Sequence, residues 1–104
     1  MERTAEMTFD VVDADDRTVK VTLSGELDIT NVEKLAAAVA PALERGPECL
    51  IVDVGGLRFA DSSAIALWVQ WATAVPDIEL RDVPPLLRRV VESMGLSSTL
   101  KVTP

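Results

Sequence analysis

Apolar and polar residues alternate over residues 7–11 and again over residues 19–24, and this repeated pattern restricts the fold more than any other feature. A period of two is typical of a strand with one buried face. The polar stretch 13–16 between the two segments is typical of a turn. The sequence therefore predicts an antiparallel hairpin near the start of the chain.

A first helix is predicted to begin near Thr30. Thr30 and Glu33 fit a capping box, in which each side chain accepts a hydrogen bond from a free backbone N–H group. Apolar residues then recur at helical spacing. Gly46 and Pro47 are expected to end this helix.

Two further helices are predicted, one near residues 63–74 and one from Pro84 to Gly95. Proline suits the first turn of a helix, and glycine suits the position that follows its last turn. The apolar stripe of the last helix comprises Leu86, Leu87, Val90, Val91 and Met94.

Short apolar segments separate the predicted helices. Residues 49–52 form an unbroken apolar run, which indicates a deeply buried strand, and residues 53–59 are predicted to be a connection. Further strands are expected over 78–80 and 99–102. The resulting order, β-β-α-β-α-β-α-β, predicts an α/β fold: one domain over residues 1–104 with helices packed on a mixed β-sheet.

The composition excludes several classes of function. A net charge of −7 argues against nucleic-acid binding and against direct binding to an anionic membrane, whereas it favours solubility or attraction to a basic protein surface. With no histidine and the single cysteine Cys49, catalytic triads and zinc sites are not expected. We expect no cofactor, no metal and no enzymatic activity. The chain has no apolar run of membrane-spanning length and no leader pattern at its start, so a cytoplasmic location is expected.

The segment Asp61-Ser62-Ser63 precedes the second predicted helix and is the first candidate site. Its simplest interpretation is a helix N-cap, since Asp and Ser accept hydrogen bonds from the first turn. The same location suits a phosphate on Ser62, because a helix N-terminus carries partial positive charge. The added negative charge would be repelled by Asp61, and a docked partner would tolerate it less well than the fold itself.

The helix after this segment is apolar on almost every side. Ile65, Val69 and Ala72 are expected to form its core face. Trp68 and Trp71 are neighbours on the helix and belong either to the core or to a docking surface, where tryptophan is favoured. We expect Trp71 to be exposed or half-exposed.

The segment Gly25-Glu26-Leu27-Asp28 ends the second predicted strand and is the third candidate site. Its simplest interpretation is a tight turn between a strand and a helix. Asp28 and Asp61 would lie close together if their loops share one edge of the sheet.

Three segments resemble the signature segments of STAS domains, most closely those of bacterial anti-sigma factor antagonists. They are residues 23–28 (Leu-Ser-Gly-Glu-Leu-Asp), residues 57–63 (Leu-Arg-Phe-Ala-Asp-Ser-Ser) and residues 84–96, which begin Pro-Pro-Leu-Leu-Arg-Arg-Val. The resemblance spans nearly the whole chain, with the segments in the same order and at similar spacing.

The resemblance implies a partner-switching mechanism. The unphosphorylated domain would bind an anti-sigma factor that is also a serine kinase, and this binding would free a sigma factor. The kinase would then phosphorylate Ser62, with Ser63 as second choice, and the complex would dissociate until a phosphatase resets the domain. The partner surface would comprise Asp28, Asp61, Ser62, Ser63, Ala64, Trp68 and Trp71.

Ala64 departs from the family pattern, which usually has glycine after the second serine. Alanine narrows the conformational freedom of the backbone beside the acceptor, which would weaken the switch. A second interpretation is therefore a STAS adaptor that does not switch, such as a stressosome component or a subunit of a lipid-transport complex. A third is a receiver-like domain phosphorylated on Asp53, which the hairpin start and the small number of alternating units disfavour.

Overall fold

The computed structural model describes residues 6–104, so the start of the chain, on which the expected absence of a leader depends, lies outside it. The elements are β1 Met7–Asp15, β2 Thr18–Leu27, α1 Val32–Glu44, β3 Cys49–Ala60, α2 Ser62–Ala74, β4 Asp77–Arg81, α3 Pro85–Ser93 and β5 Lys101–Val102. This order confirms the predicted sequence of strands and helices. Within the described residues, no helix combines the length and the apolar character needed to span a bilayer.

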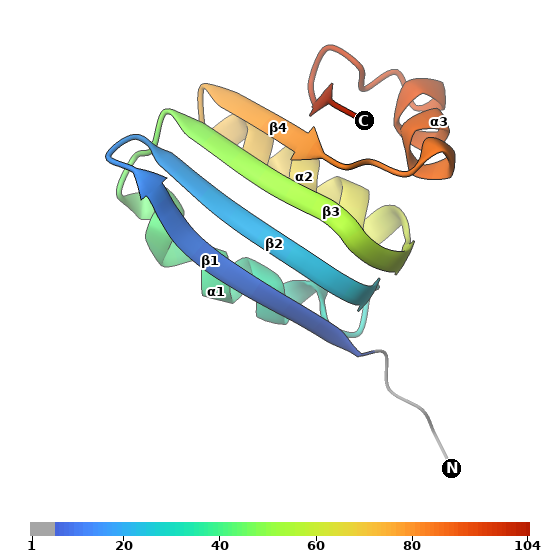
Figure 1. Ribbon diagram of the computed structural model, residues 1–104, viewed down its shortest axis with the longest axis horizontal. Coiled ribbons are helices and arrows are strands. Elements are labelled where there is room, and N and C mark those ends of the chain that lie inside the picture. The colour runs from blue at the N-terminus through green and yellow to red at the C-terminus, as the bar shows by residue number, and fades with distance from the viewer. Residues whose placement is uncertain (1–5) are drawn as a thin grey trace.

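The strands form a mixed five-stranded sheet in the order β1-β2-β3-β4-β5. β1 and β2 are antiparallel, as the alternating pattern predicts, and the remaining neighbours are parallel. In Figure 1, α1 and α2 lie behind the sheet, whereas α3 lies beyond the end of β4. One face of the sheet is therefore covered by two helices, and α3 borders the end of the sheet at which β3 finishes.

Alternation along β2 determines which side chains enter the core. Val19, Val21 and Leu23 are buried, whereas the polar residues between them are only partly buried. In β3, Leu50 and Val52 belong to the same core cluster, and Ile51 between them is buried as well, as the unbroken apolar run predicts. Because each of the alternating apolar positions of β2 faces the helices, a one-residue slip in register would expose the whole set.

β3 is longer than the sequence predicts. Residues 53–59, expected to be a connection, continue the strand and pair with β2 to its end, where Ala60 lies opposite Leu27. The pairing contains two register shifts, one after Asp53 and one after Leu57. These irregularities break the period of two, which is why the segment does not have the sequence pattern of a strand.

The beginning of α1 also differs from the prediction. The expected capping box of Thr30 and Glu33 does not form, because the N-cap residue is Asn31 and the helix begins at Val32. The Thr30 hydroxyl donates instead to the Asp28 carboxylate, over 2.6 Å. The Asn31 side chain accepts from the backbone N–H of Asp28 and so stabilises the preceding loop rather than the helix.

Both tryptophans of α2 lie in the core. Trp68 is fully buried and Trp71 is only 4% exposed, so the expectation of an exposed or half-exposed Trp71 is wrong. The predicted core face is also rotated, because Val69 and Ala72 are only partly buried. Burying two large aromatic side chains removes more apolar surface from water than burying the smaller residues would, and this decides the orientation of the helix.

Candidate functional site

Ser62 is the first residue of α2 and is exposed to solvent. Its hydroxyl makes no hydrogen bond within residues 6–104, whereas the hydroxyl of Ser63 donates to the carboxylate of Asp61. The two serines are therefore not equivalent. Ser62 offers an accessible and unoccupied hydroxyl, and Ser63 is engaged in the cap of the helix.

Asp61 is the N-cap residue of α2, as its residue type predicts. Its carboxylate accepts from the backbone N–H of Ser63 over 2.9 Å as well as from the Ser63 hydroxyl. These hydrogen bonds, with the side-chain one the strongest, hold the pKa of Asp61 below its ordinary value. The carboxylate is therefore ionised and fixed at the start of the helix, one residue before Ser62.

The loop of Asp28 lies beside that of Asp61. Leu27 pairs with Ala60 at the ends of β2 and β3, and the backbone N–H of Asp61 donates to the carbonyl of Leu27 over 3.3 Å. The Asp28 carboxylate accepts from the backbone N–H of Thr30 over 2.8 Å. The structure thus brings the two predicted acidic loops together at one edge of the sheet.

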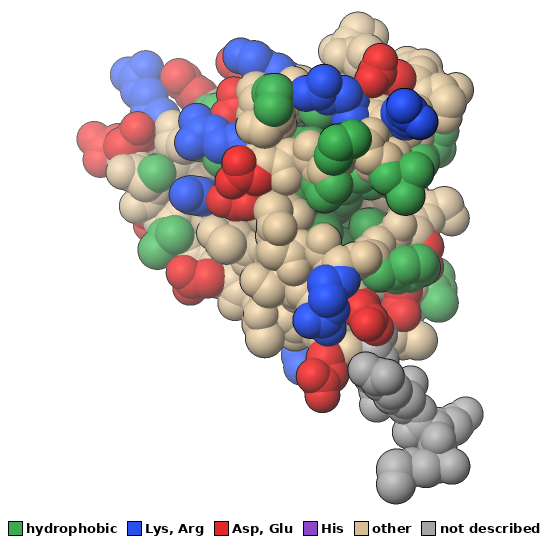
Figure 2. All heavy atoms as spheres, turned by 45° about the vertical axis from the view of Figure 1, so that its right-hand side comes forward, with side chains coloured by type: hydrophobic (Ala, Val, Ile, Leu, Met, Phe, Trp, Pro, Cys, Tyr) green, Lys and Arg blue, Asp and Glu red, His purple; other side chains and the backbone are tan. Residues whose placement is uncertain are grey.

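An apolar groove adjoins Ser62. It lies between the end of β3 and α3, has a volume of about 330 Å³, and is here called the β3–α3 groove. Its lining comprises Leu57, Arg58, Phe59, Ala60, Asp61, Ser62, Ile65, Pro84, Leu86, Leu87, Val90 and Met94. Figure 2 shows hydrophobic side chains gathered on this side of the molecule, with basic side chains near their border.

Three residues predicted for the partner surface do not reach it. The side chains of Ala64, Trp68 and Trp71 are buried in the core, so they cannot contact a partner without unfolding. They face the sheet because they fall on the inner side of α2, whereas Ser62 precedes them at its exposed end. These three side chains pack the core and so hold α2, and with it Ser62, in place.

Sequence reasoning missed the apolar groove. Leu86, Val90 and Met94 belong to the predicted apolar stripe of the last helix but are exposed, and of α3 only Val91 is buried. Phe59, which is 51% exposed, lies in the segment expected to be a connection. The width of the apolar stripe of α3 could have indicated this groove. A helix that packs on the core with one face needs fewer apolar positions than this helix has.

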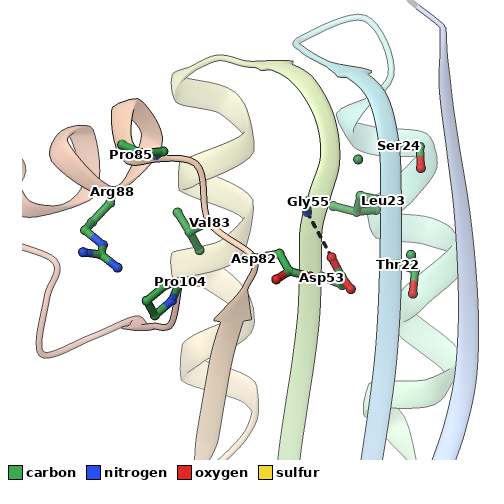
Figure 3. Close-up of a pocket in the computed structure, with 11 residues that line it drawn as sticks. Thr22, Leu23, Ser24, Asp53, Gly55, Asp82, Val83, Pro85, Arg88 and Pro104 are labelled. Atoms are coloured by element: carbon green, nitrogen blue, oxygen red, sulfur yellow. Dashed lines mark hydrogen bonds between the residues drawn. The ribbon is translucent and has the colours of Figure 1, made fainter.

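A second hollow, lined by both polar and apolar residues, lies beside the middle of β3 and the end of β4 (Figure 3). Asp53 and Asp82 extend into it from the two elements, and the Asp53 carboxylate accepts from the backbone N–H of Gly55 over 3.0 Å. Asp53 lies within β3, opposite Thr22 and Arg81, rather than at the end of the strand. This position gives no support to the receiver-like interpretation.

The site belongs to a small α/β domain that presents a free serine hydroxyl at a helix N-terminus beside an apolar groove. Residues 11–103 match the family model described as "Mlab, STAS domain". The chain therefore belongs to the STAS domain family, as the three sequence segments suggest. No curated protein sequence matches the chain significantly.

Solved structures share the whole architecture. An anti-sigma factor antagonist from Mycobacterium paratuberculosis superposes with a TM-score of 0.84 at 22% identity, covering 95% of this chain and 86% of that chain. The anti-sigma factor antagonist SpoIIAA in its unphosphorylated form gives a TM-score of 0.79 at 25% identity, covering 93% of this chain and 89% of that chain. The Bacillus cell fate determinant SpoIIAA in its phosphorylated form gives 0.74 at 25% identity, covering 93% and 92%.

Proposed function

We propose that this chain is an anti-sigma factor antagonist. In this proposal it acts by binding rather than by catalysis, in the cytoplasm. It binds an anti-sigma factor with serine kinase activity and thereby releases a sigma factor. Phosphorylation on Ser62 ends the interaction, and a phosphatase restores it. The structural likeness to antagonists, one of them solved in a phosphorylated form, supports the assignment.

The free hydroxyl of Ser62 is the observation that carries the proposal. It is exposed at the N-terminus of α2, where a phosphate is favoured by the helix dipole. The neighbouring Asp61 is ionised, so a phosphate brings like charges together at the surface that a partner would contact. The helix accommodates part of that charge, whereas a docked protein must bury it.

Ala64 does not obstruct this mechanism sterically. Its methyl group is fully buried in the core, whereas Ser62 is exposed, so the methyl group does not cover the acceptor hydroxyl. Compared with glycine, alanine also favours the helix. The departure from the family pattern therefore strengthens the helix that presents Ser62 instead of covering the acceptor.

Phosphate transfer tests the proposal directly. The chain is incubated with ATP and the candidate anti-sigma factor kinases of the same genome, and the modified residue is located by mass spectrometry. We expect phosphate on Ser62, loss of phosphate in Ser62→Ala, and retention in the matched control Ser63→Ala. Phosphorylation of Ser63 alone, or unchanged partner affinity after phosphorylation of Ser62, would contradict the proposed switch.

A second candidate function is a STAS adaptor that does not switch. The observation behind this possibility is that the matching family model is described as "Mlab, STAS domain" and not as an anti-sigma factor antagonist. An adaptor would use the same exposed surface but bind constitutively. It predicts no phosphate on Ser62 with any kinase of the same genome, and equal partner binding by Ser62→Ala and Ser62→Glu.

A further inference from the structure

We propose that Arg58 holds the phosphate of phosphorylated Ser62, by leaving its contact with Glu26 and crossing the β3–α3 groove. The phosphorylation itself belongs to the proposed function, on which this inference rests, whereas the residue that binds the phosphate is a new assignment. Three observations lead to it: the bulge that carries Arg58, the weakness of its present contact, and the groove that it shares with Ser62.

Arg58 is the extra residue of a β-bulge. In the pairing of β2 with β3, Gly25 lies opposite Leu57 and Glu26 lies opposite Phe59, so Arg58 has no partner of its own in the ladder. A bulge redirects the side chains of the strand that contains it, and bulges are common beside functional sites. This one lies near the end of β3, shortly before the start of α2.

The present contact of Arg58 is a weak one. Its Nη2 atom lies 3.8 Å from Oε2 of Glu26, which is too long for a hydrogen bond. The exposed fractions of the two side chains are 67% and 34%, so water screens their attraction and the pair contributes little to stability. Arg58 can therefore exchange Glu26 for a stronger partner without destabilising the fold.

Arg58 and Ser62 line the same groove, whose volume is about 330 Å³. Arg58 comes from the end of β3, and Ser62 comes from the first turn of α2. Both side chains are exposed. Because arginine is long and flexible and a phosphate lengthens the serine side chain, the two groups can meet across a groove of this size.

A phosphate suits this guanidinium better than Glu26 does. Arginine presents its N–H groups in a planar fork that matches two phosphate oxygens, and such charge-assisted pairs are the stronger hydrogen bonds. Among the residues that line the groove, Arg58 alone is basic and Asp61 alone is acidic. Asp61 is ionised and repels the phosphate, so the positive charge of Arg58 compensates for the N-cap that precedes the acceptor.

This contact would also close the groove in the phosphorylated chain. While Ser62 is unmodified, Arg58 lies against Glu26 and the apolar lining is open. When Arg58 crosses to the phosphate, its alkyl stem covers part of that lining, because long basic side chains pack their stems on apolar surface. A partner must then break the contact before it can dock, so phosphorylation opposes binding by occupancy as well as by charge.

The second pKa of the phosphate reports the contact. Phosphoserine placed at position 62 during translation makes the measurement independent of any kinase, and phosphorus NMR follows the titration. A nearby cation favours the dianion, so we expect Arg58→Gln to raise this pKa by at least about 0.5 and Arg58→Lys to restore most of the difference. The matched control is Arg89→Gln, which removes the same charge from an exposed residue of α3 outside the groove lining and should leave the pKa unchanged.

Two further readouts distinguish a direct contact from a general effect of charge. The Nε–H signal of Arg58 should shift and exchange with water at least about threefold more slowly once Ser62 is phosphorylated, as a hydrogen-bonded group does. Glu26→Gln removes the competing carboxylate and should lower the pKa of the phosphate, opposite to Arg58→Gln. An unchanged pKa in Arg58→Gln, an equal rise in Arg89→Gln, or an Nε–H signal that ignores phosphorylation would overturn the inference.

A parallel assay of phosphate transfer to Ser62 separates this inference from the proposed function. Phosphorylation by a kinase, with a phosphate pKa that does not depend on Arg58, would overturn the assignment of Arg58 alone. A pKa that depends on Arg58, in a chain that no kinase of the same genome phosphorylates, would overturn the proposed switch and leave Arg58 as the residue that binds a phosphate at position 62.

Discussion

Adjacent serines at the start of α2 differ in what surrounds their hydroxyls. The Ser63 hydroxyl donates to Asp61, whereas that of Ser62 makes no hydrogen bond within the described residues. Because the Asp61 carboxylate accepts the hydrogen bond of the Ser63 hydroxyl, only the Ser62 hydroxyl of this pair remains free. A kinase that needs a freely rotating hydroxyl would find it only at Ser62.

The cap gives a prediction about pH. Because the folded state lowers the pKa of Asp61, the unfolded chain binds more protons, so this contribution to stability is present above the unfolded pKa near 3.8. It is lost as the pH falls further, through the lower pKa of the folded state. We expect Asp61→Asn, which keeps an acceptor oxygen but does not titrate, to show a flatter decline of unfolding free energy with acidification.

Urea unfolding at a series of pH values measures this difference. Asp61→Ala serves as the control, because it removes the cap as well as the charge and should cost about 1 kcal/mol even near neutral pH. Parallel profiles for the wild type and Asp61→Asn would show that Asp61 does not contribute to acid unfolding.

Trp71 provides a second prediction at this scale. Because Trp71 is only 4% exposed, Trp71→Ala creates a cavity in the core and should lower the unfolding free energy by about 3–5 kcal/mol. Partner affinity per folded molecule should be unchanged. Thermal unfolding and titration calorimetry below the melting transition separate the two effects. A large loss of affinity with unchanged stability would return Trp71 to the partner surface.

At the scale of elements, the pairing between the start of β1 and the last residues of β2 depends on Gly25. Its φ of +93° lies in the left-handed region, and a Cβ atom there would come within 2.2 Å of the carbonyl oxygen of Glu6. Gly95, after α3, also has a positive φ, but a Cβ there would have no neighbour within 4 Å. We therefore expect Gly25→Ala to destabilise the fold more than Gly95→Ala.

The control substitution Gly95→Ala should cost about 1–2 kcal/mol, the usual penalty for a side chain in left-handed backbone. Gly25→Ala should exceed it, because the backbone of β1 must also move away. Chemical unfolding of both variants gives the comparison, and equal losses would indicate that the start of β1 readily adjusts.

Periodicity allowed most elements to be predicted from the sequence. The hairpin, the body of α1 and α3 have regular apolar spacing, and Asp61 has the residue type of an N-cap, so these features were located correctly. The end of β3 was not, because its two register shifts interrupt the alternation after Asp53. The start of α1 was misplaced for a different reason: Thr30 and Asn31 bond to the loop of Asp28 rather than to the helix.

The candidate site was predicted only in part, because it depends on how elements meet. The acidic loops and Ser62 could be identified from local sequence. The orientation of α2 could not, since both of its faces are apolar and only tertiary packing decides that Trp68 and Trp71 point inward. The groove likewise requires the end of β3 and α3 to lie side by side, which no local pattern specifies.

At the scale of the whole molecule, the stabilising core and the proposed switch are separated. α1 and α2 pack on one face of the sheet, and Ser62 lies at the exposed end of α2, next to α3 (Figure 1). A change of charge at that end of α2 would act directly on a bound partner and would not require the core to rearrange. In the proposed mechanism, the domain is therefore regulated without being unfolded.

This separation predicts that phosphorylation of Ser62 alters binding far more than stability. A dianion at a helix N-terminus is stabilised by the dipole, and repulsion from Asp61 offsets part of the gain, so the unfolding free energy should change by no more than about 1 kcal/mol. Partner affinity should fall by at least about tenfold, because the interface must desolvate the phosphate beside Asp61. Calorimetric unfolding and partner titration of the phosphorylated and unphosphorylated chains provide both quantities. A loss of unfolding free energy as large as that expected for Trp71→Ala would contradict this prediction. It would mean that phosphorylation of Ser62 loosens the packing of the core, because a phosphate that stays on the surface cannot cost that much stability.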